Sequence, residues 1–371
     1  MMKVLTRLAV AAATAGIPAT VAAQATNLTV HGYVTQGYAS SQDAPLYGIS
    51  EKGTADYRAM ALQFRYATSP TDAIVFQLSH RRLGASLIQE TEPDVGLDWG
   101  FFQTNFAGNS VRVGKVPMPR GLYNEVRDVG TIFPFYRASK AFYSEGVETV
   151  DGLSVGRSIE LGAFSVDASA YAGEFDVKVE LVTTNGLEVI NSRVKKTVGA
   201  HVTVNTPITG LRFSADYLSG KSTSDGKWPL WTAGVDLSKD RFFVRGEYEV
   251  VHTKDADGAD NTEYLAWYSQ AGVGITEKLW ANWQYEFNSI TAFGVLPSPP
   301  LPSPDVSYDN IKDNAFSLNY KLTPRLVMKG EYHNFTGYQL DKATPPINPA
   351  NGQPLPAGKA KYFILSLAAA F

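Results

Sequence analysis

One long segment of the sequence, residues 117 to 146, combines charged side chains of both signs with prolines, glycines and aromatic rings. Proline fixes the backbone angle φ and aromatic rings offer packing surface, so such a segment can fold against a wall rather than extend into water. Guanidinium and carboxylate groups held there can either pair with one another and hold the segment, or face water and sort solutes by charge. The charged residues are Arg120, Glu125, Arg127, Asp128, Arg137, Lys140 and Glu145.

The histidines form no pattern that catalysis or metal binding requires. The chain has no G-x-S-x-G or H-E-x-x-H motif, and no histidine spacing that suggests a shared metal. It has no cysteine, which excludes thiolate catalysis, cysteine-ligated zinc and a disulfide framework. We therefore expect no catalytic residue, no metal and no cofactor, and we predict that the protein is not an enzyme. The histidines are His31, His80, His201, His252 and His333.

Composition narrows the class of fold and of partner. A chain of 371 residues is long enough for two soluble domains or for one large closed barrel. Hydrophobic residues make up 44% of it, with 19 Tyr and 19 Phe, which favours β-structure. The formal net charge is -3 and the basic residues are scattered along the chain, so we expect no nucleic acid as a partner.

The first residues have the pattern of an export signal. Lys3 and Arg7 precede an apolar, Ala-rich run, and Ala23 and Ala25 supply the small residues that a signal peptidase reads. The alternative is a buried N-terminal helix, but the run is short for a membrane span. We predict a signal peptide over residues 1–25, cleaved after Ala25, and a single mature domain over residues 26–371.

Much of the mature chain consists of segments of about ten residues in which apolar and polar residues alternate. From Leu279 to Asn288 the odd-numbered residues are apolar, while Asn, Gln and Glu occupy most even positions. The same pattern occurs in residues 60–66, 211–217, 244–250 and 316–321. A strand of a transmembrane barrel needs roughly 9–11 residues with this alternation. Charges on the second face would be costly in a dry core but cost little in a water-filled lumen.

Short turns and long loops alternate between these segments. The short connections are rich in Asn, Asp, Gly and Pro, as in Ser69–Asp72. The long ones include residues 117–146, 173–195, 291–311 and 337–358. Turns on one rim and long loops on the other are typical of outer-membrane barrels. We predict an all-β fold, a transmembrane antiparallel β-barrel of about sixteen strands, in which the sixth and seventh strands have the weakest alternation.

The end of the chain indicates where this barrel resides. Phe363, Leu365, Leu367, Ala369 and Phe371 lie on one face of the last predicted strand. This resembles the terminal sorting signal of bacterial outer-membrane proteins, an alternating apolar strand that ends in an aromatic residue. A soluble β-protein can end in the same way, but it would not combine this strand with an export signal and alternating loop lengths. We therefore expect a bacterial outer-membrane protein that contacts outer-membrane lipid.

Two stretches of sequence carry a family resemblance. Residues 31–38, His-Gly-Tyr-Val-Thr-Gln-Gly-Tyr, and residues 113–125, from Val113 to Glu125, resemble Gram-negative porins, nearest to the phosphate-selective group. The resemblance implies a homotrimer of sixteen-stranded barrels, with the third outer loop folded into the lumen as a constriction. The chain departs from the phosphate-selective group in having no evident Lys-rich array on its long loops.

The third long loop and the nearby wall together make the candidate pore site. A porin constriction works by opposing charges on the wall and on the inserted loop, which filter solutes by charge and size. Inward parity supplies basic wall residues, so basic groups predominate and we predict a modest anion preference. Pairing among the loop residues themselves is the alternative. The predicted pore-lining residues are Arg65, Arg81, Arg112, Lys115, Arg120, Glu125, Arg127, Asp128 and Arg137.

The expected function is passive diffusion of small hydrophilic solutes and ions, anions among them, through an outer-membrane porin. The alternative from another class is a closed-lumen adhesin or structural barrel, whose proline-rich loops after Ser289 and Thr336 would be binding surfaces. An outer-membrane barrel hydrolase is a less favoured alternative, because no catalytic motif accompanies the histidines. A ligand-gated transporter would need a plug domain before the first strand, and too few residues separate Ala25 from that strand.

Overall fold

The computed structural model describes residues 27–84, 94–143, 146–183, 186–223, 226–293, 305–341 and 355–371, apart from the side chains of residues 179–188 and 190. The predicted signal peptide and Glu145 lie outside these ranges. The described strands are β1 Leu28–Gln42, β2 Thr54–Ala67, β3 Asp72–Leu83, β4 Gly96–Phe106, β5 Asn109–Pro117, β6 Thr149–Leu161, β7 Phe164–Thr183, β8 Gly186–Asn205, β9 Leu211–Lys221, β10 Leu230–Lys239, β11 Phe242–Lys254, β12 Asp260–Gly274, β13 Leu279–Ala292, β14 Val306–Thr323, β15 Leu326–Gly337 and β16 Gly358–Ala370. A short 3₁₀ helix, η1, spans Asn124–Val126.

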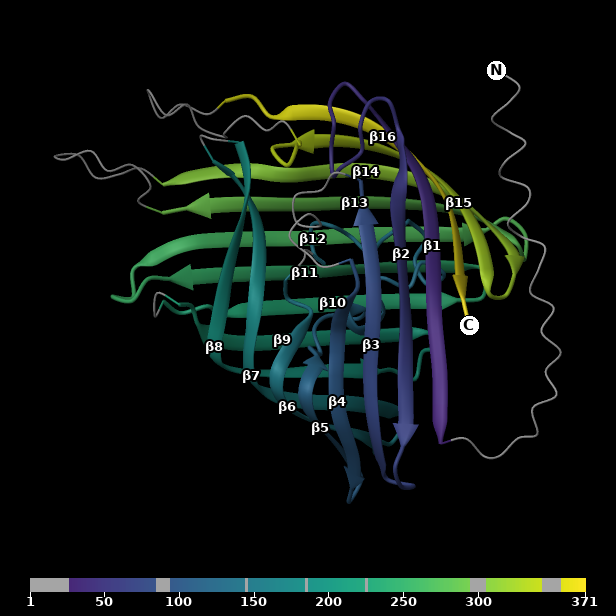
Figure 1. Cartoon of the computed structure of the whole chain (residues 1–371), viewed down its shortest axis with the longest axis vertical. Coiled ribbons are helices and arrows are strands. Elements are labelled where there is room, and N and C mark those ends of the chain that lie inside the picture. The colour runs from purple at the N-terminus through teal and green to yellow at the C-terminus, as the bar shows by residue number, and fades with distance from the viewer. Residues whose placement is uncertain are drawn as a thin grey trace.

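These strands form one closed antiparallel barrel. Each pairs with its neighbours in the sequence, and β1 also pairs with β16 from Tyr33↔Ala370 to Gln42↔Lys361, which leaves no open edge. The predictions of closure and of about sixteen strands are confirmed. In Figure 1, β1–β4 run at a steep angle to β10–β13, as tilted strands on opposite walls of a barrel do when both are seen at once.

One of the predicted long loops is wrong. Residues 173–195, expected as a long loop, belong to β7 and β8, which are 20 residues each and pair out to Thr183↔Gly186. Because a membrane crossing needs only about 9–11 residues, the outer halves of these strands extend past it as a hairpin. The sequence carries a signal for this: β-branched residues stand on both sides of an Asn-Gly dipeptide at 185–186.

The barrel carries large apolar side chains on its outer surface and polar side chains on its inner surface, which is the opposite of the arrangement in a soluble protein. On β13 the side chain of Trp283 is exposed, whereas Asn282, Gln284 and Glu286 on the other face are buried. Large hydrophobic side chains are exposed in the same way around the barrel, among them Leu62, Phe213, Phe316 and Leu365. Such a belt suits a hydrocarbon environment and would be unfavourable in water. No helix in the described part of the chain is long and apolar enough to cross a membrane.

The first long connection, residues 43–53, packs against inward-facing side chains. Leu46 and Ile49 are fully buried, and the ring of Tyr47 makes edge contacts with Phe335 on β15 and Tyr362 on β16. The carboxylate of Asp341, beyond β15, accepts a hydrogen bond from the Gly48 amide at 2.9 Å. Part of the lumen near the long-loop rim is therefore filled by protein.

Candidate pore constriction

The connection between β5 and β6, residues 118–148, is called the inner segment below. Its backbone is hydrogen-bonded to side chains that point inward from the far wall. Gly121 N donates to Asp216 Oδ2 on β9 at 3.0 Å, and Leu122 N donates to Glu247 Oε1 on β11 at 2.6 Å. Further along, Lys329 Nζ on β15 donates to the carbonyl oxygen of Phe135 at 2.5 Å. These contacts hold the inner segment within the barrel.

Arg120 is the most buried anchor of the inner segment. Its side chain is 1% exposed, its Nε lies 2.7 Å from Glu249 Oε2 on β11, and its Nη2 donates to the carbonyl oxygen of Phe142 at 2.7 Å. Its guanidinium also lies 4.8 Å from the centre of the Phe142 ring. A group without water contact cannot select solutes, so Arg120, predicted as pore-lining, joins loop to wall instead.

Two tyrosines complete the attachment. Tyr123 Oη donates to Asp236 Oδ2 on β10 at 2.6 Å and accepts from Arg245 Nη1 on β11 at 3.0 Å. Tyr143 Oη donates to Glu247 Oε2 at 2.5 Å. The sequence analysis did not identify Asp236, Arg245 or Glu247 as anchors. Their inward parity could be predicted, but parity does not say which loop covers them.

The opposite side of the inner segment remains in contact with water. Arg112, inward on β5, pairs with Glu125 of the segment, with Nη1 to Oε1 at 2.9 Å. The two side chains are 29% and 50% exposed, which makes this the most accessible charged pair between wall and segment. A predicted basic wall residue thus faces a predicted acidic loop residue.

A second charged group also joins the wall to the inner segment. Arg81, inward on β3, is 3.2 Å from Asp128 and 3.5 Å from Glu148 at the end of the segment. Arg127 Nη2 lies 3.1 Å from the same Glu148 oxygen. Burial alone would raise the pKa of Glu148, but the neighbouring Arg127 and Arg81 lower it to about 2. Glu148 is therefore ionised at neutral pH and ties Arg127 to the wall.

Arg137 lies where the inner segment meets the first connection. Its guanidinium is 4.5 Å from the centre of the Tyr47 ring. Nearby is an enclosed cavity of about 40 Å³, lined in part by Arg81, Arg127, Asp128, Arg137 and Lys140. It is large enough for a water molecule, but its size does not describe a passage through the barrel.

Two predicted residues form no ion pair with this group among the described residues, although the charge of Lys115 contributes to the lowered pKa of Glu148. Lys115 occupies the outward row of β5, opposite Gly100 and Asp151, and its Nζ donates to the carbonyl oxygen of Leu97 at 2.7 Å. Its position on the strand, next to inward Val116, puts it on the lipid-facing side. Arg65 points inward on β2 toward the short-turn rim and has no ion-pair partner among the described residues.

The predicted residues thus differ in whether they take part in charged pairs at the inner segment. Arg112 with Glu125, and Arg81 and Arg127 with Asp128 and Glu148, form two groups of charged pairs at the inner segment, of which the first is the more exposed. Their opposite charges are in contact rather than separated across a wide gap. The arrangement can hold the segment in place and can present fixed charges to a passing ion.

Comparison with known proteins identifies the fold. No protein-family model and no curated protein matches the chain. Among solved structures, OmpF of Salmonella typhi in complex with daunomycin gives a TM-score of 0.58 at 12% identity and covers 93% of this chain and 97% of its own. An anion-selective porin of Comamonas acidovorans gives 0.54 at 11% identity, with 93% and 99% covered. The trimer form of in-vitro folded OmpT, an outer membrane protein of Vibrio cholerae, gives 0.52 at 11% identity, with 93% and 99% covered.

At these identities the likeness concerns the fold. The class is the outer-membrane β-barrel of Gram-negative bacteria, here with sixteen antiparallel strands in the described part of the chain. The fold and the apolar outer surface are those of a bacterial outer-membrane protein.

Proposed function

We propose that this protein is an outer-membrane porin that lets small hydrophilic solutes and ions diffuse passively, with a modest preference for anions. The observation that carries the proposal is the two-sided inner segment. One side is buried through Arg120 and Tyr143, while the other presents Glu125 to Arg112 on the wall with both side chains partly exposed. A loop fixed on one side and wet on the other is suited to set the size and charge limits of a pore.

The anion preference follows from the charges near the accessible lumen. Arg81 and Arg112 point inward from the wall and pair with Asp128, Glu148 and Glu125, whereas Arg65, also inward, has no ion-pair partner among the described residues. At a distance the fields of the paired charges cancel, so the positive field of Arg65 remains. The Comamonas acidovorans protein of the same fold is an anion-selective porin, which is consistent with this sign.

Two measurements test the proposal. Liposomes that contain the purified protein should swell in isosmotic solutions of small neutral sugars and swell progressively less as the sugar grows. In a salt gradient across a planar bilayer, the reversal potential should have the sign of anion flow. Swelling without anion selectivity would retain the pore and remove the charge assignment.

One observation favours a second candidate, a closed-lumen structural or adhesin barrel. The first connection and the inner segment bury much of the wall from β9 to β16, including Lys329 and Asp313, which have no exposed surface. A barrel whose lumen is filled in this way would stay folded but would not conduct ions. Absence of both swelling and ion current in a correctly folded preparation would favour this candidate.

The assembly and the processing of the chain belong to the same proposal. We propose a homotrimer, for which the trimer form of Vibrio cholerae OmpT is a precedent within the shared fold. We also propose removal of residues 1–25. The mass of the protein isolated from outer membranes, in detergent and after denaturation, measures both.

A further inference from the structure

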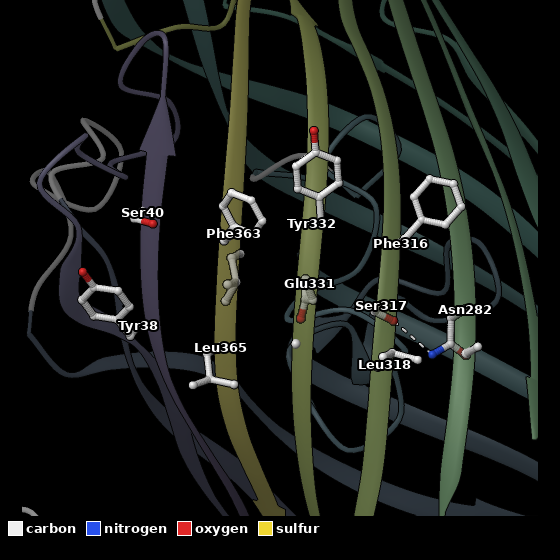
Figure 2. A pocket seen from close by; sticks show the side chains of 13 residues that line it. Tyr38, Ser40, Asn282, Phe316, Ser317, Leu318, Glu331, Tyr332, Phe363 and Leu365 are labelled. Atoms are coloured by element: carbon white, nitrogen blue, oxygen red, sulfur yellow. Dashed lines mark hydrogen bonds between the residues drawn. The ribbon is translucent and has the colours of Figure 1, made fainter. Parts of the chain in front are cut away.

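The outer face of the barrel carries a groove over β13–β16 and β1, with a volume of about 560 Å³ (Figure 2). Its floor is Gly330 on β15, which pairs with Leu318 on β14 and Leu365 on β16. A Cβ atom built on Gly330 would meet no atom within 4 Å, so the missing side chain leaves open space. Because Gly330 lies on the outward row, this space faces the membrane.

Aromatic rings border the groove on the side nearer the long loops. Figure 2 shows Phe316, Tyr332 and Phe363 next to one another on β14, β15 and β16, with Leu318 and Leu365 below them. The rings of Tyr332 and Phe363 are in contact, with centroids 4.9 Å apart. The groove is therefore a concave, largely apolar surface bordered by aromatic rings, which suits a hydrocarbon chain.

Two lysines follow directly on the same outward row. Beyond Leu365 and Phe363, the outward positions of β16 are Lys361 and Lys359, both exposed. Outward residues on a strand are spaced by about 7 Å along the backbone, so the Cα atom of Lys361 lies one such step past that of Phe363. Neither lysine has an ion-pair partner within the described ranges of the chain.

We propose that the groove binds an acyl chain of an anionic phospholipid-like molecule, with its phosphate against Lys361 and Lys359. An apolar slot and two cations, in that order along one strand, match the order of chain and head group at a membrane surface. This inference rests on the membrane location of the barrel and does not depend on an open pore.

A second copy of the chain fits the same surface less well. It would have to bring acidic groups to the two lysines, since burying unpaired ammonium groups is unfavourable. Two outward acids described near this rim already have cationic partners: Asp56 pairs with Arg58 and Arg82, and Asp309 pairs with Lys312 at the surface. A lipid phosphate supplies the missing charge without such a requirement.

The test uses native mass spectrometry of the full-length mature protein, titrated with phosphatidylglycerol, phosphatidylcholine or inorganic phosphate. We expect one retained phosphatidylglycerol per chain, bound several-fold more tightly than phosphatidylcholine, and no effect of inorganic phosphate. The double variant Lys359→Gln/Lys361→Gln should bind both lipids equally. Gly330→Leu, which the open space accommodates, should weaken the binding of both lipids about tenfold, because the leucine side chain would fill the groove.

Matched controls separate these effects from general changes. Lys239→Gln/Lys278→Gln removes the same charge from the short-turn rim, and Gly100→Leu adds the same side chain to the outward row of β4. Both should bind lipid as the wild type does. Equal binding of the two lipids by the wild type, or unchanged binding by both groove variants, would overturn the proposal. So would loss of oligomers in Gly330→Leu with lipid binding intact, which would assign the groove to a second copy.

Discussion

At the scale of single residues, exposure decides which charged groups can act on a solute. Arg120 and Arg112 are both arginines paired with a glutamate at the inner segment, yet Arg120 is almost fully buried and Arg112 is 29% exposed. Sequence patterns assigned both to the lumen, because inward parity and loop composition do not measure burial. The residue types were informative, but contact with water was not predictable from them.

Arg112 is the residue at which selectivity is most directly testable. Arg112→Glu replaces the wall cation with an anion facing Glu125, so the permeability ratio of anions over cations should fall by about twofold or more. The reversal potential in a salt gradient measures this ratio. Lys278→Glu, at the opposite rim, makes the same charge change and should have little effect. A reversal potential that Arg112→Glu leaves unaltered would exclude Arg112 from the ion path.

Glu148 gives the inner segment a defined dependence on pH. Its pKa, 4.5 in a free side chain, is lowered to about 2 beside Arg127 and Arg81. A carboxyl whose pKa is lowered in the folded state stabilises that state above its usual pKa, and the stabilisation disappears as pH falls toward the lowered value. The contribution at neutral pH is at most about 3 kcal/mol.

The stability difference between the wild type and Glu148→Gln should therefore be large at pH 7 and should shrink between about pH 4.5 and pH 2. Thermal unfolding of the detergent-solubilised protein, followed on gels across this pH range, measures the difference. If this stability difference stayed constant from pH 7 to pH 2, the ionised carboxylate of Glu148 would not be the group that Arg81 and Arg127 stabilise.

At the scale of elements, the strands were predictable and the path of the inner segment was not. Alternation in residues such as Trp283 and Gln284 reflects a local period of two, which any strand between lipid and water must have. The route of the segment depends instead on contacts between residues far apart in sequence, such as Gly121 with Asp216. In the β7–β8 hairpin the apolar and charged residues of 175–181 still alternate, so alternation alone does not mark where a strand leaves the membrane.

The Arg120–Glu249 pair should be the main attachment of this element. Arg120→Met leaves the Glu249 carboxylate buried without its partner, which should cost about 3–5 kcal/mol in stability and make the single-channel current noisy. The double variant Arg120→Met/Glu249→Met should recover most of that stability. Arg112→Met, at an accessible pair, should cost only about 0–1 kcal/mol. Equal losses for Arg120→Met and Arg112→Met would contradict the division into buried and wet sides.

A close approach of the inner segment to β1 supplies an independent probe. A Cβ atom on Gly130 would lie 2.3 Å from Thr35 Oγ1 and 3.0 Å from Ala368 Cβ, so this position has no room for a side chain. Gly130→Leu should displace the segment and alter the single-channel conductance. Gly156→Ala, at an inward position with ordinary contacts, is the control and should conduct as the wild type does. Identical conductance in all three proteins would place the current away from the segment.

At the scale of the whole molecule, the barrel combines an apolar exterior with an interior that is partly filled and partly wet. The exterior could be predicted from the sequence, since alternation, loop lengths and the terminal aromatic strand together indicate a closed sheet in lipid. The interior depends on how the first connection and the inner segment share the lumen between them. Leu46 and Ile49 fill one part of it, and the Arg112–Glu125 pair borders the part that contacts water.

For the proposed porin function, this wet part must be continuous from one rim to the other. Incorporation of the purified, correctly folded protein into a planar bilayer at neutral pH measures whether it is. We expect stepwise insertions, each followed by a steady ionic current that scales with salt concentration. Insertion of folded barrels, verified by lipid association and protease resistance, without any steady current would contradict the proposed function.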